Sequence, residues 1–153
     1  MITWFLQLLS GVDYLHANKM MHRDIKPANV FMHQNMIKLG DLGLSKQVFT
    51  GVSKAGIHTQ CGSPLYLAPE VHMGSENGAC IYTSAVDIWA MGCIMAELFT
   101  GNPLLPGQSE TDMLMRLSKL IGNIPHTWDK GFEVAKKTGV NFMPGSLVDP
   151  SQE

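Results

Sequence analysis

The feature that most constrains this sequence is a run of residues from Val86 to Phe99 that is apolar almost all round. Ser84 and Asp87 have the S-x-x-D spacing of a helix start, and Gly101 stands where a glycine commonly ends a helix. The pattern predicts a helix over about 84–100. Because a helix without a polar face must be covered on all sides, we expect it to form the centre of the fold.

The composition is that of one globular domain. Of the 153 residues, 45% are hydrophobic and 16% are charged, which allows a core and argues against disorder. The formal net charge of −2 provides no basic face for nucleic acid, and no apolar run is long enough to span a membrane. We therefore expect neither a nucleic-acid nor a membrane partner.

The cysteines and the first nine residues indicate the cellular compartment in which the protein is expected. Cys61, Cys80 and Cys93 form no C-x-x-C pair and are odd in number, which favours free thiols in a reducing environment. Residues 1–9 are apolar but lack the basic start and the small-residue cleavage site of a signal peptide. We expect an intracellular protein, cytoplasmic or nuclear.

Hydrophobic periodicity predicts the other elements. Apolar residues at helical spacing predict a helix over about 1–18, and they include Phe5, Leu8, Leu9, Val12 and Leu15. A second pattern, which begins at Ser109, predicts a helix over about 110–121. Two β-runs, 30–32 and 36–39, are joined by turn residues and indicate a hairpin. Residues 40–70 have no sustained period, and the tail at 123–153 is expected to be irregular. The expected fold class is α+β, predominantly α, with a small β-hairpin.

A polar loop at 20–29 contains the string H-R-D-I-K-P-A-N, residues 22–29. Phosphoryl transfer to a hydroxyl group requires an acceptor that orients the nucleophile and takes its proton, and Asp24 has that chemistry. The phosphates also require neutralisation, which the Lys26 ammonium and a Mg²⁺ ion on the Asn29 amide oxygen would provide. The alternative is that Asp24 and Asn29 are ordinary loop residues, because both types favour turns.

Four motifs, in order and over most of the chain, resemble the eukaryotic-type serine/threonine protein kinase family. The string at 22–29 matches the catalytic loop H-R-D-x-x-x-x-N, and D-L-G at 41–43 is similar to D-F-G. A-P-E at 68–70 follows G-S-P-L-Y at 62–66, a form that resembles serine/threonine kinases. D-I-W-A-M-G at 87–92 resembles the D-x-W-x-x-G of a central helix.

The resemblance implies the C-terminal lobe of a kinase domain over residues 1–153, with a catalytic loop at 20–29 and an activation segment at 41–70. The implied activity is ATP- and Mg²⁺-dependent phosphoryl transfer to serine or threonine of a protein substrate. By family position the catalytic residues are Asp24 and Lys26, the cofactor contacts are Lys26, Asn29 and Asp41, and the metal ligands are Asn29 and Asp41.

Other motif positions have docking or structural roles in the family. The substrate-docking loop includes Gly62, Ser63 and Tyr66, and the Ser63 hydroxyl is expected to bridge Asp24 and Lys26. Asp87 is expected to accept hydrogen bonds from catalytic-loop N–H groups, since a buried carboxylate is costly without them. The remaining structural positions are His22, Gly43, Glu70, Trp89 and Gly92.

Three residues are candidates for regulation. Arg23 precedes Asp24, and in the family it is a buried cation that pairs with a phosphate on the activation segment. Thr59 lies four residues before Ser63, where many members carry that phosphate, and Lys46 is a second basic partner. The alternative is that Thr59 is a solvated loop threonine.

Subfamily signals are mixed. Residues 21–31 and 38–43 resemble NIMA-related kinases, whereas residues 98–107 and 109–112 resemble the group of cyclin-dependent and male-germ-cell-associated kinases. Leu67 stands before A-P-E where proline-directed members usually have Arg, so a proline-directed substrate is not predicted. Neither His16 nor His72 has a second potential metal ligand at helical spacing. This favours a role in packing or at the surface over metal binding.

The sequence has no G-x-G-x-x-G and no V-A-I-K-like lysine, so an N-terminal lobe is expected to be absent. Glu70 pairs in the family with an Arg of later helices, and the remaining candidate here is Arg116. A buried carboxylate without its partner is destabilising. We therefore expect the isolated chain to be marginally stable and inactive. The alternative function is a non-catalytic, kinase-like interaction module.

Overall fold

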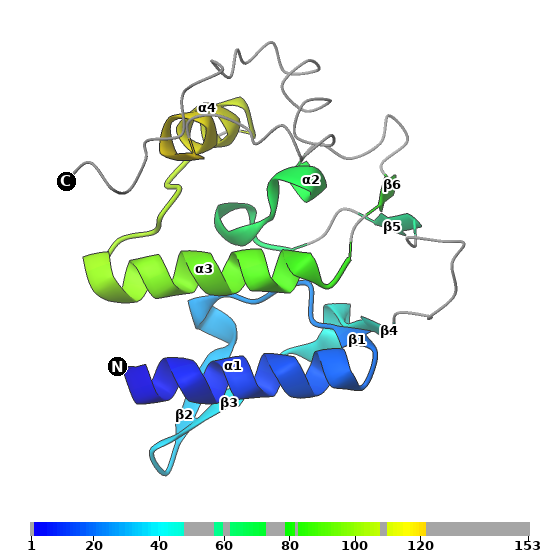
Figure 1. Cartoon of the computed structure of the whole chain (residues 1–153), viewed down its shortest axis with the longest axis vertical. Helices are drawn as coiled ribbons and strands as arrows, with labels where there is room; N and C mark the ends of the chain where they lie inside the picture. Colours follow the sequence, from blue (N-terminus) through cyan, green and yellow to red (C-terminus); the bar gives the residue numbers. More distant parts are fainter. Residues whose placement is uncertain are drawn as a thin grey trace, which may run out of the picture. The chain divides into compact units, whose positions relative to one another are not determined.

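The computed structural model describes residues 2–47, 57–59, 62–72, 79–81, 83–107 and 110–121. The chain divides into two compact units, Met1–Pro106 and Gly107–Glu153. The described part of the first unit contains three α-helices and three two-stranded sheets, shown in Figure 1. The predominance of helix that the sequence predicts is confirmed, and the strands are more numerous than the single predicted hairpin.

Helix α1 extends over Ile2–Ala17 and packs through one face. Its buried residues are Leu8, Val12 and Leu15, as the apolar spacing predicts, but Leu9 is 39% exposed. Leu9 was wrongly assigned to the core face, because it lies about 100° around the helix from Leu8. The helix ends as the backbone of Lys19 turns to the left-handed region, with φ of 60°.

Helix α3 extends over Ala85–Thr100 and ends at Gly101, as predicted. Gly101 has φ of 73°, and its N–H donates to the carbonyl oxygen of Glu97 at 2.8 Å, which satisfies a terminal carbonyl. The predicted capping box at the start is wrong. Within the described residues the Ser84 side chain makes no capping bond, and the Asp87 carboxylate points instead to the loop at 20–29.

The expectation that α3 is covered all round is also wrong. Its buried residues are Val86, Asp87, Ala90, Met91, Cys93 and Ile94. The side chains of Ile88 and Phe99 are 52% and 68% exposed. In the first unit α1 and the 3₁₀ turn Pro64–Tyr66 pack against α3, and together they cover only part of its circumference.

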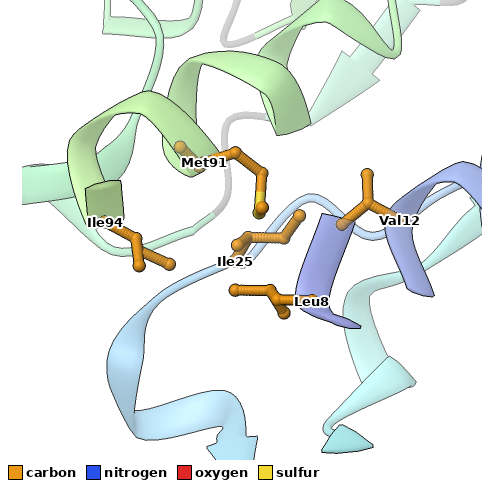
Figure 2. Packing of buried hydrophobic residues seen from close by; sticks show 6 residues of the cluster. Leu8, Val12, Ile25, Met91 and Ile94 are labelled. Atoms are coloured by element: carbon orange, nitrogen blue, oxygen red, sulfur yellow. The ribbon is translucent and has the colours of Figure 1, made fainter. Parts of the chain in front are cut away.

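The core of the first unit lies between α1 and α3. Figure 2 shows the Ile25 side chain between Leu8 of α1 and Met91 of α3. Ile25 is 2% exposed and belongs to the polar loop, so the residue that follows Asp24 is fixed in the core by apolar contacts on both sides. This packing ties the loop to two helices.

Strands β2 (Val30–His33) and β3 (Met36–Leu39) form the predicted hairpin. The turn is one residue shorter than predicted, because His33 pairs with Met36 and only Gln34 and Asn35 remain. Both turn residues have positive φ, 48° and 63°, as a tight hairpin turn requires. The side-chain oxygen of Gln7 in α1 accepts the N–H of Ile37 at 2.7 Å and holds the hairpin on the helix.

Two further sheets pair segments that lie far apart in the sequence. Strand β1 (Met20–Met21) is antiparallel to β4 (Lys46–Gln47), and β5 (Ile57–Thr59) is antiparallel to β6 (Ala79–Ile81). Helix α2 covers Pro69–His72. Residues 48–56 and 60–61 of the expected activation segment lie outside the described residues.

The described part of the second unit includes helix α4 (Glu110–Ile121), which corresponds to the helix predicted over about 110–121. Met113 and Leu117 are buried. Ser109 and the tail at 123–153 lie outside the described residues. None of the described helices is both long and apolar enough to cross a bilayer.

Two glycines, Gly92 within α3 and Gly101 directly after it, give opposite stability predictions. A Cβ at Gly92 would meet no atom within 4 Å among the described residues, so Gly92→Ala removes only the entropic cost of glycine. We expect the free energy of unfolding to rise by about 0.5–1 kcal/mol. Gly101→Ala must hold a side chain at φ of 73°, so we expect a loss of about 1–2 kcal/mol.

Urea denaturation followed by circular dichroism measures both glycine variants against the unmodified protein. Equal shifts of the unfolding midpoint in the same direction would contradict the assignment of Gly101 as the helix terminator.

Candidate active site

The Asp87 carboxylate fixes the backbone of the loop at 20–29. Its Oδ2 accepts the N–H of His22 and its Oδ1 accepts the N–H of Arg23, both at 2.9 Å. Asp87 is only 1% exposed, so these bonds replace water around a buried charge. They are the contacts that the sequence predicts for this residue.

Arg23 has an unusual backbone conformation. Its φ is 72°, in the left-handed region, which costs a non-glycine residue about 1–2 kcal/mol. Its Nε donates to the carbonyl oxygen of Leu44 at 2.6 Å, so the side chain reaches the segment after D-L-G. The prediction of a buried cation is wrong in degree, because Arg23 is half-buried.

His22 joins the loop to the segment that carries Asp41. The ring is fully buried, with Nε2 at 2.9 Å from the carbonyl oxygen of Gly40 and Nδ1 at 3.3 Å from the backbone nitrogen of Asp24. A carbonyl oxygen only accepts and a backbone N–H only donates, so Nε2 carries the proton and Nδ1 is the acceptor. The structural role expected of His22 therefore requires one ring tautomer, with the proton on Nε2. In that tautomer the ring binds both the loop at 20–29 and the segment that carries Asp41.

The Asp24 carboxylate lies at the centre of a polar cluster and is 7% exposed. Lys26 Nζ is 2.8 Å from Oδ2, and the Asn29 amide nitrogen donates to the same oxygen at 3.1 Å. Oδ1 accepts the backbone N–H of Ser63 at 3.0 Å and its hydroxyl at 3.1 Å. Lys26 Nζ also donates to the Ser63 hydroxyl oxygen at 2.8 Å, so Ser63 bridges Asp24 and Lys26 as predicted.

Asn29 and Asp41 have the oxygen atoms that Mg²⁺ requires. The Asn29 amide nitrogen donates to the backbone and side-chain oxygens of Asp24, which leaves the amide oxygen as its ligand atom. The N–H of Gly40 donates to the carbonyl oxygen of Asn29 at 2.9 Å, so the hairpin brings Asn29 beside the residue that precedes Asp41. Asp41 is exposed, and one oxygen accepts the N–H of Gly43 at 3.3 Å.

This donor set fits a magnesium ion that also binds phosphate oxygens. Among the described residues there is no cluster of three or more histidine, cysteine, aspartate or glutamate side chains suited to a metal. Magnesium commonly takes only one or two protein carboxylates and completes its shell with substrate phosphates and water. One carboxylate and one amide oxygen are therefore sufficient from the protein.

The predicted docking loop lies directly against the loop at 20–29. Gly62 has φ of 110°, and a Cβ there would be 2.7 Å from the backbone oxygen of Arg23. The Tyr66 hydroxyl donates to Oε2 of Glu97 in α3 at 2.7 Å. Burial first, and then the bond to Glu97 and its charge, raise the pKa of Tyr66 far above its usual value, so the hydroxyl remains a donor.

Three further structural positions, Trp89, Gly43 and Gly92, differ in their burial and in their contacts. Trp89 is half-buried against the cluster of Met21, Ala68, Val71 and Val86. Its indole N–H has no partner among the described residues. Gly43 donates to Asp41, whereas Gly92 is exposed in the middle of α3.

The expected full burial of Glu70 is wrong, because the residue is partly exposed. Within the second unit, Arg116 donates to Asp112, one turn away in α4, at 3.0 Å. The penalty expected for an unpaired buried carboxylate therefore does not apply at full size.

The structure describes the three candidate regulatory residues only in part. Lys46 is exposed on β4 and pairs with Met21, two residues before Arg23, so two of the three residues lie on neighbouring segments. The backbone of Thr59 pairs with Ala79 in the β5–β6 sheet, but its side chain lies outside the described residues. Phosphate pairing at Thr59 stays a prediction.

Two site residues were missed in the sequence. Nε2 of His16 is 2.7 Å from Oδ2 of Asp87, although its spacing favoured a packing or surface role. Glu97, the partner of Tyr66, was counted only as part of an apolar helix. Glu97 is one of only two carboxylates in that apolar helix, with Asp87, and this is the signal that could have drawn attention to it. His72, whose Nε2 is 3.1 Å from the carbonyl oxygen of Pro64, has the packing role expected of it.

The cluster around Asp24 gives stability a pH dependence. Burial raises the pKa of Asp24, but the hydrogen bonds from Lys26, Ser63 and Asn29 and the charge of Lys26 outweigh burial and leave it below the ordinary value of 3.8. A lowered folded-state pKa stabilises the fold above the unfolded pKa, and that stabilisation disappears as the pH falls through the folded value.

We therefore expect the stability of the protein to decline below about pH 3.8 partly because Asp24 becomes protonated. Asp24→Asn should flatten this part of the curve of unfolding free energy against pH. Chemical denaturation of both proteins from pH 6 to pH 2.5 measures it, and parallel curves would contradict a lowered pKa.

Comparison with known proteins places this geometry in a family. A model described as protein kinase domain matches residues 1–145. Cyclin-dependent kinase F-3 of Oryza sativa subsp. japonica is 39% identical over 142 residues, which cover 92% of this chain and 31% of the relative.

Two further relatives give the same picture. Cyclin-dependent kinase F-4 of the same organism is 38% identical, covering 91% of this chain and 29% of the relative. Serine/threonine-protein kinase ICK of Mus musculus is 35% identical, covering 90% of this chain and 21% of the relative. The chain thus spans about a third or less of the length of these relatives. Because the family model matches nearly the whole chain, the chain belongs to the protein kinase domain family.

Proposed function

We propose that this chain is the C-terminal lobe of a protein serine/threonine kinase, which transfers a phosphoryl group from ATP to a hydroxyl group of a protein substrate in a Mg²⁺-dependent reaction. The observation that carries the proposal is the cluster in which Asp24, Lys26, Asn29 and Ser63 meet within hydrogen-bond distance. The relatives are named as cyclin-dependent or serine/threonine-protein kinases, which supports the same class.

Asp24 is the acceptor for the substrate proton. Four donor contacts from Lys26, Asn29 and Ser63 keep its carboxylate ionised and fixed, so it is available to orient a hydroxyl group at neutral pH. The Ser63 bonds come from the docking loop, so a substrate held by that loop meets the carboxylate in a set position. Orientation is the main contribution of such a residue in phosphoryl transfer.

Lys26 and the two metal ligands serve the phosphate side. The Lys26 ammonium, between Asp24 and Ser63, is placed to neutralise charge on the transferred group. The Asn29 amide oxygen and the Asp41 carboxylate would hold Mg²⁺, which supplies charge neutralisation at the phosphates when bound. Both side chains have an oxygen that the described hydrogen bonds leave available.

Phosphate-covering elements are not found in this sequence, which contains no G-x-G-x-x-G. We infer that the 153 residues alone bind ATP too weakly for turnover and that activity belongs to a longer protein. A non-catalytic interaction module is the second candidate. The joint presence of Asp24, Lys26, Asn29 and Asp41 favours the enzyme, because a binding module has no need of all four.

The catalytic assignment predicts that Asp24→Asn in a full-length protein containing these residues lowers kcat by about 10²-fold or more, with the KM for ATP nearly unchanged. Asparagine preserves the shape but accepts protons poorly. A phosphotransfer assay with labelled ATP and a serine-containing protein substrate measures the effect. Asp112→Asn, outside the cluster, is the matched control, and equal activity of the two variants would reject the proposed function.

The contact between the two loops predicts that adding one methyl group at Gly62 lowers activity. Gly62→Ala places a methyl group 2.7 Å from the Arg23 carbonyl oxygen at φ of 110°, so the docking loop must move from Asp24. We expect kcat/KM for the protein substrate to fall at least about tenfold, as displacement of a reacting group by about 1 Å does. Unchanged kcat/KM in steady-state kinetics would mean that the contact at Gly62 does not fix the position of the docking loop relative to Asp24.

A further inference from the structure

Helix α2 ends in a buried histidine that contacts the docking loop. His72 is only 7% exposed, and its Nε2 lies 3.1 Å from the carbonyl oxygen of Pro64. Because a carbonyl oxygen only accepts, Nε2 carries the proton of this bond. The buried position agrees with the packing role expected from the sequence. Packing alone, however, requires no polar contact, so the hydrogen bond needs a separate explanation.

The carbonyl of Pro64 begins the turn of the docking loop. Pro64–Tyr66 is a 3₁₀ turn, and the N–H of Leu67 closes it by donating to this oxygen at 3.4 Å. That distance is longer than the usual 2.7–3.2 Å of such bonds, so the closure is weak. The ring of His72 supplies the shorter of the two bonds that this oxygen accepts within the described residues. The turn therefore depends on a donor from outside the loop.

Helix α2 provides a fixed base for that donor. Its residue Val71 and the preceding Ala68 are 2% and 1% exposed, and they pack in one cluster with Met21 of β1 and Val86 of α3. The backbone N–H of His72 donates to the carbonyl oxygen of Ala68 at 3.2 Å. A ring attached to this buried backbone can restrain the exposed loop that it contacts.

The turn lies between two other attachments of the docking loop. On one side Ser63 donates to Asp24, and on the other the Tyr66 hydroxyl donates to Glu97 of α3. Pro64 has no N–H and its side chain is exposed, so its carbonyl is the group through which the rest of the protein can hold it. The histidine of α2 contacts that group.

We propose that His72 is a positioning residue for the protein substrate, which holds the carbonyl of Pro64 and so sets the shape of the docking loop beside Asp24. The proposal rests on the proposed kinase function and extends it to α2. Because His72 acts through the docking loop, its effect falls on the protein substrate. The phosphate side, which Lys26 and the two metal ligands serve, is unaffected.

The test compares a substitution that keeps the donor with one that keeps the apolar bulk. In a full-length kinase containing these residues, His72→Gln places an amide N–H about where Nε2 lies, whereas His72→Leu fills the site without a donor. We expect His72→Leu to raise the KM for the protein substrate about three- to tenfold and His72→Gln to raise it less than about twofold. The KM for ATP should be unchanged in both. His33→Leu, at an exposed histidine of β2, is the matched control and should behave as the unmodified protein.

A role in packing alone predicts the reverse order, because leucine suits a buried site better than glutamine does. A higher KM for the protein substrate in His72→Gln than in His72→Leu, or equal values in the two variants, would therefore overturn the proposal. If His72→Leu does not fold, His72→Asn takes its place, since its amide ends about one bond short of Nε2.

A second measurement reports on the loop itself. The N–H groups of Tyr66 and Leu67 close turns within the docking loop. Hydrogen exchange followed by mass spectrometry should show faster exchange of the peptide containing residues 62–67 in His72→Leu, and the exchange of the unmodified protein in His72→Gln. Equal exchange of this peptide in both variants would mean that His72 does not hold the loop.

The kinase assignment can fail separately. If Asp24→Asn retains full transferase activity, the proposed function is rejected, while the exchange of residues 62–67 still decides whether His72 holds the loop. If Asp24→Asn is inactive and His72→Leu has the kinetics of the unmodified protein, the kinase function stands and only the role of His72 is rejected.

Discussion

The buried charge of Asp87 is the interaction on which the first unit depends. An ionised carboxylate enclosed in apolar surroundings costs several kcal/mol unless donors surround it, and α3 offers none from its own side chains nearby. The donors come from the loop at His22 and Arg23 and from His16 at the end of α1. Satisfying one charge thus requires three segments to meet. Ile25 then enters the core between the two helices, so apolar packing and the polar requirement select the same arrangement.

Local sequence patterns were sufficient to predict most of the helices and the hairpin. Apolar spacing indicated α1 and α4, the turn residues indicated the β2–β3 hairpin, and Gly101 indicated the end of α3. Errors occurred where a side chain had two available partners. Ser84 and Asp87 have the spacing of a cap, but the two loop N–H groups compete successfully for the carboxylate because they are buried with it. Pairings such as β1 with β4 were not predicted, since two-residue strands have no period to read.

The sequence predicted which residues form the candidate site, but it predicted only part of their arrangement in space. The family resemblance supplied Asp24, Lys26, Asn29 and Ser63, and their contacts agree with it. The resemblance did not supply the partners that lie far away in sequence, such as His16 for Asp87 or Glu97 for Tyr66. Nor could it supply the positive φ of Arg23, because residue type predicts that conformation well only for glycine and, to a lesser degree, asparagine and aspartate. These features arise from tertiary contact.

The close approach at Gly62 has an evolutionary consequence. The position lies in the loop proposed to hold the substrate, where diversification would be expected, yet a backbone oxygen 2.7 Å from any added Cβ leaves no room for one. A backbone atom cannot swing away as a side chain could. Paralogues built on this frame would therefore have to acquire new substrate preferences at neighbouring positions whose side chains face solvent, such as Pro64, while position 62 stays invariant. The position in contact with the backbone of Arg23 and the exposed position that is free to change are only two residues apart.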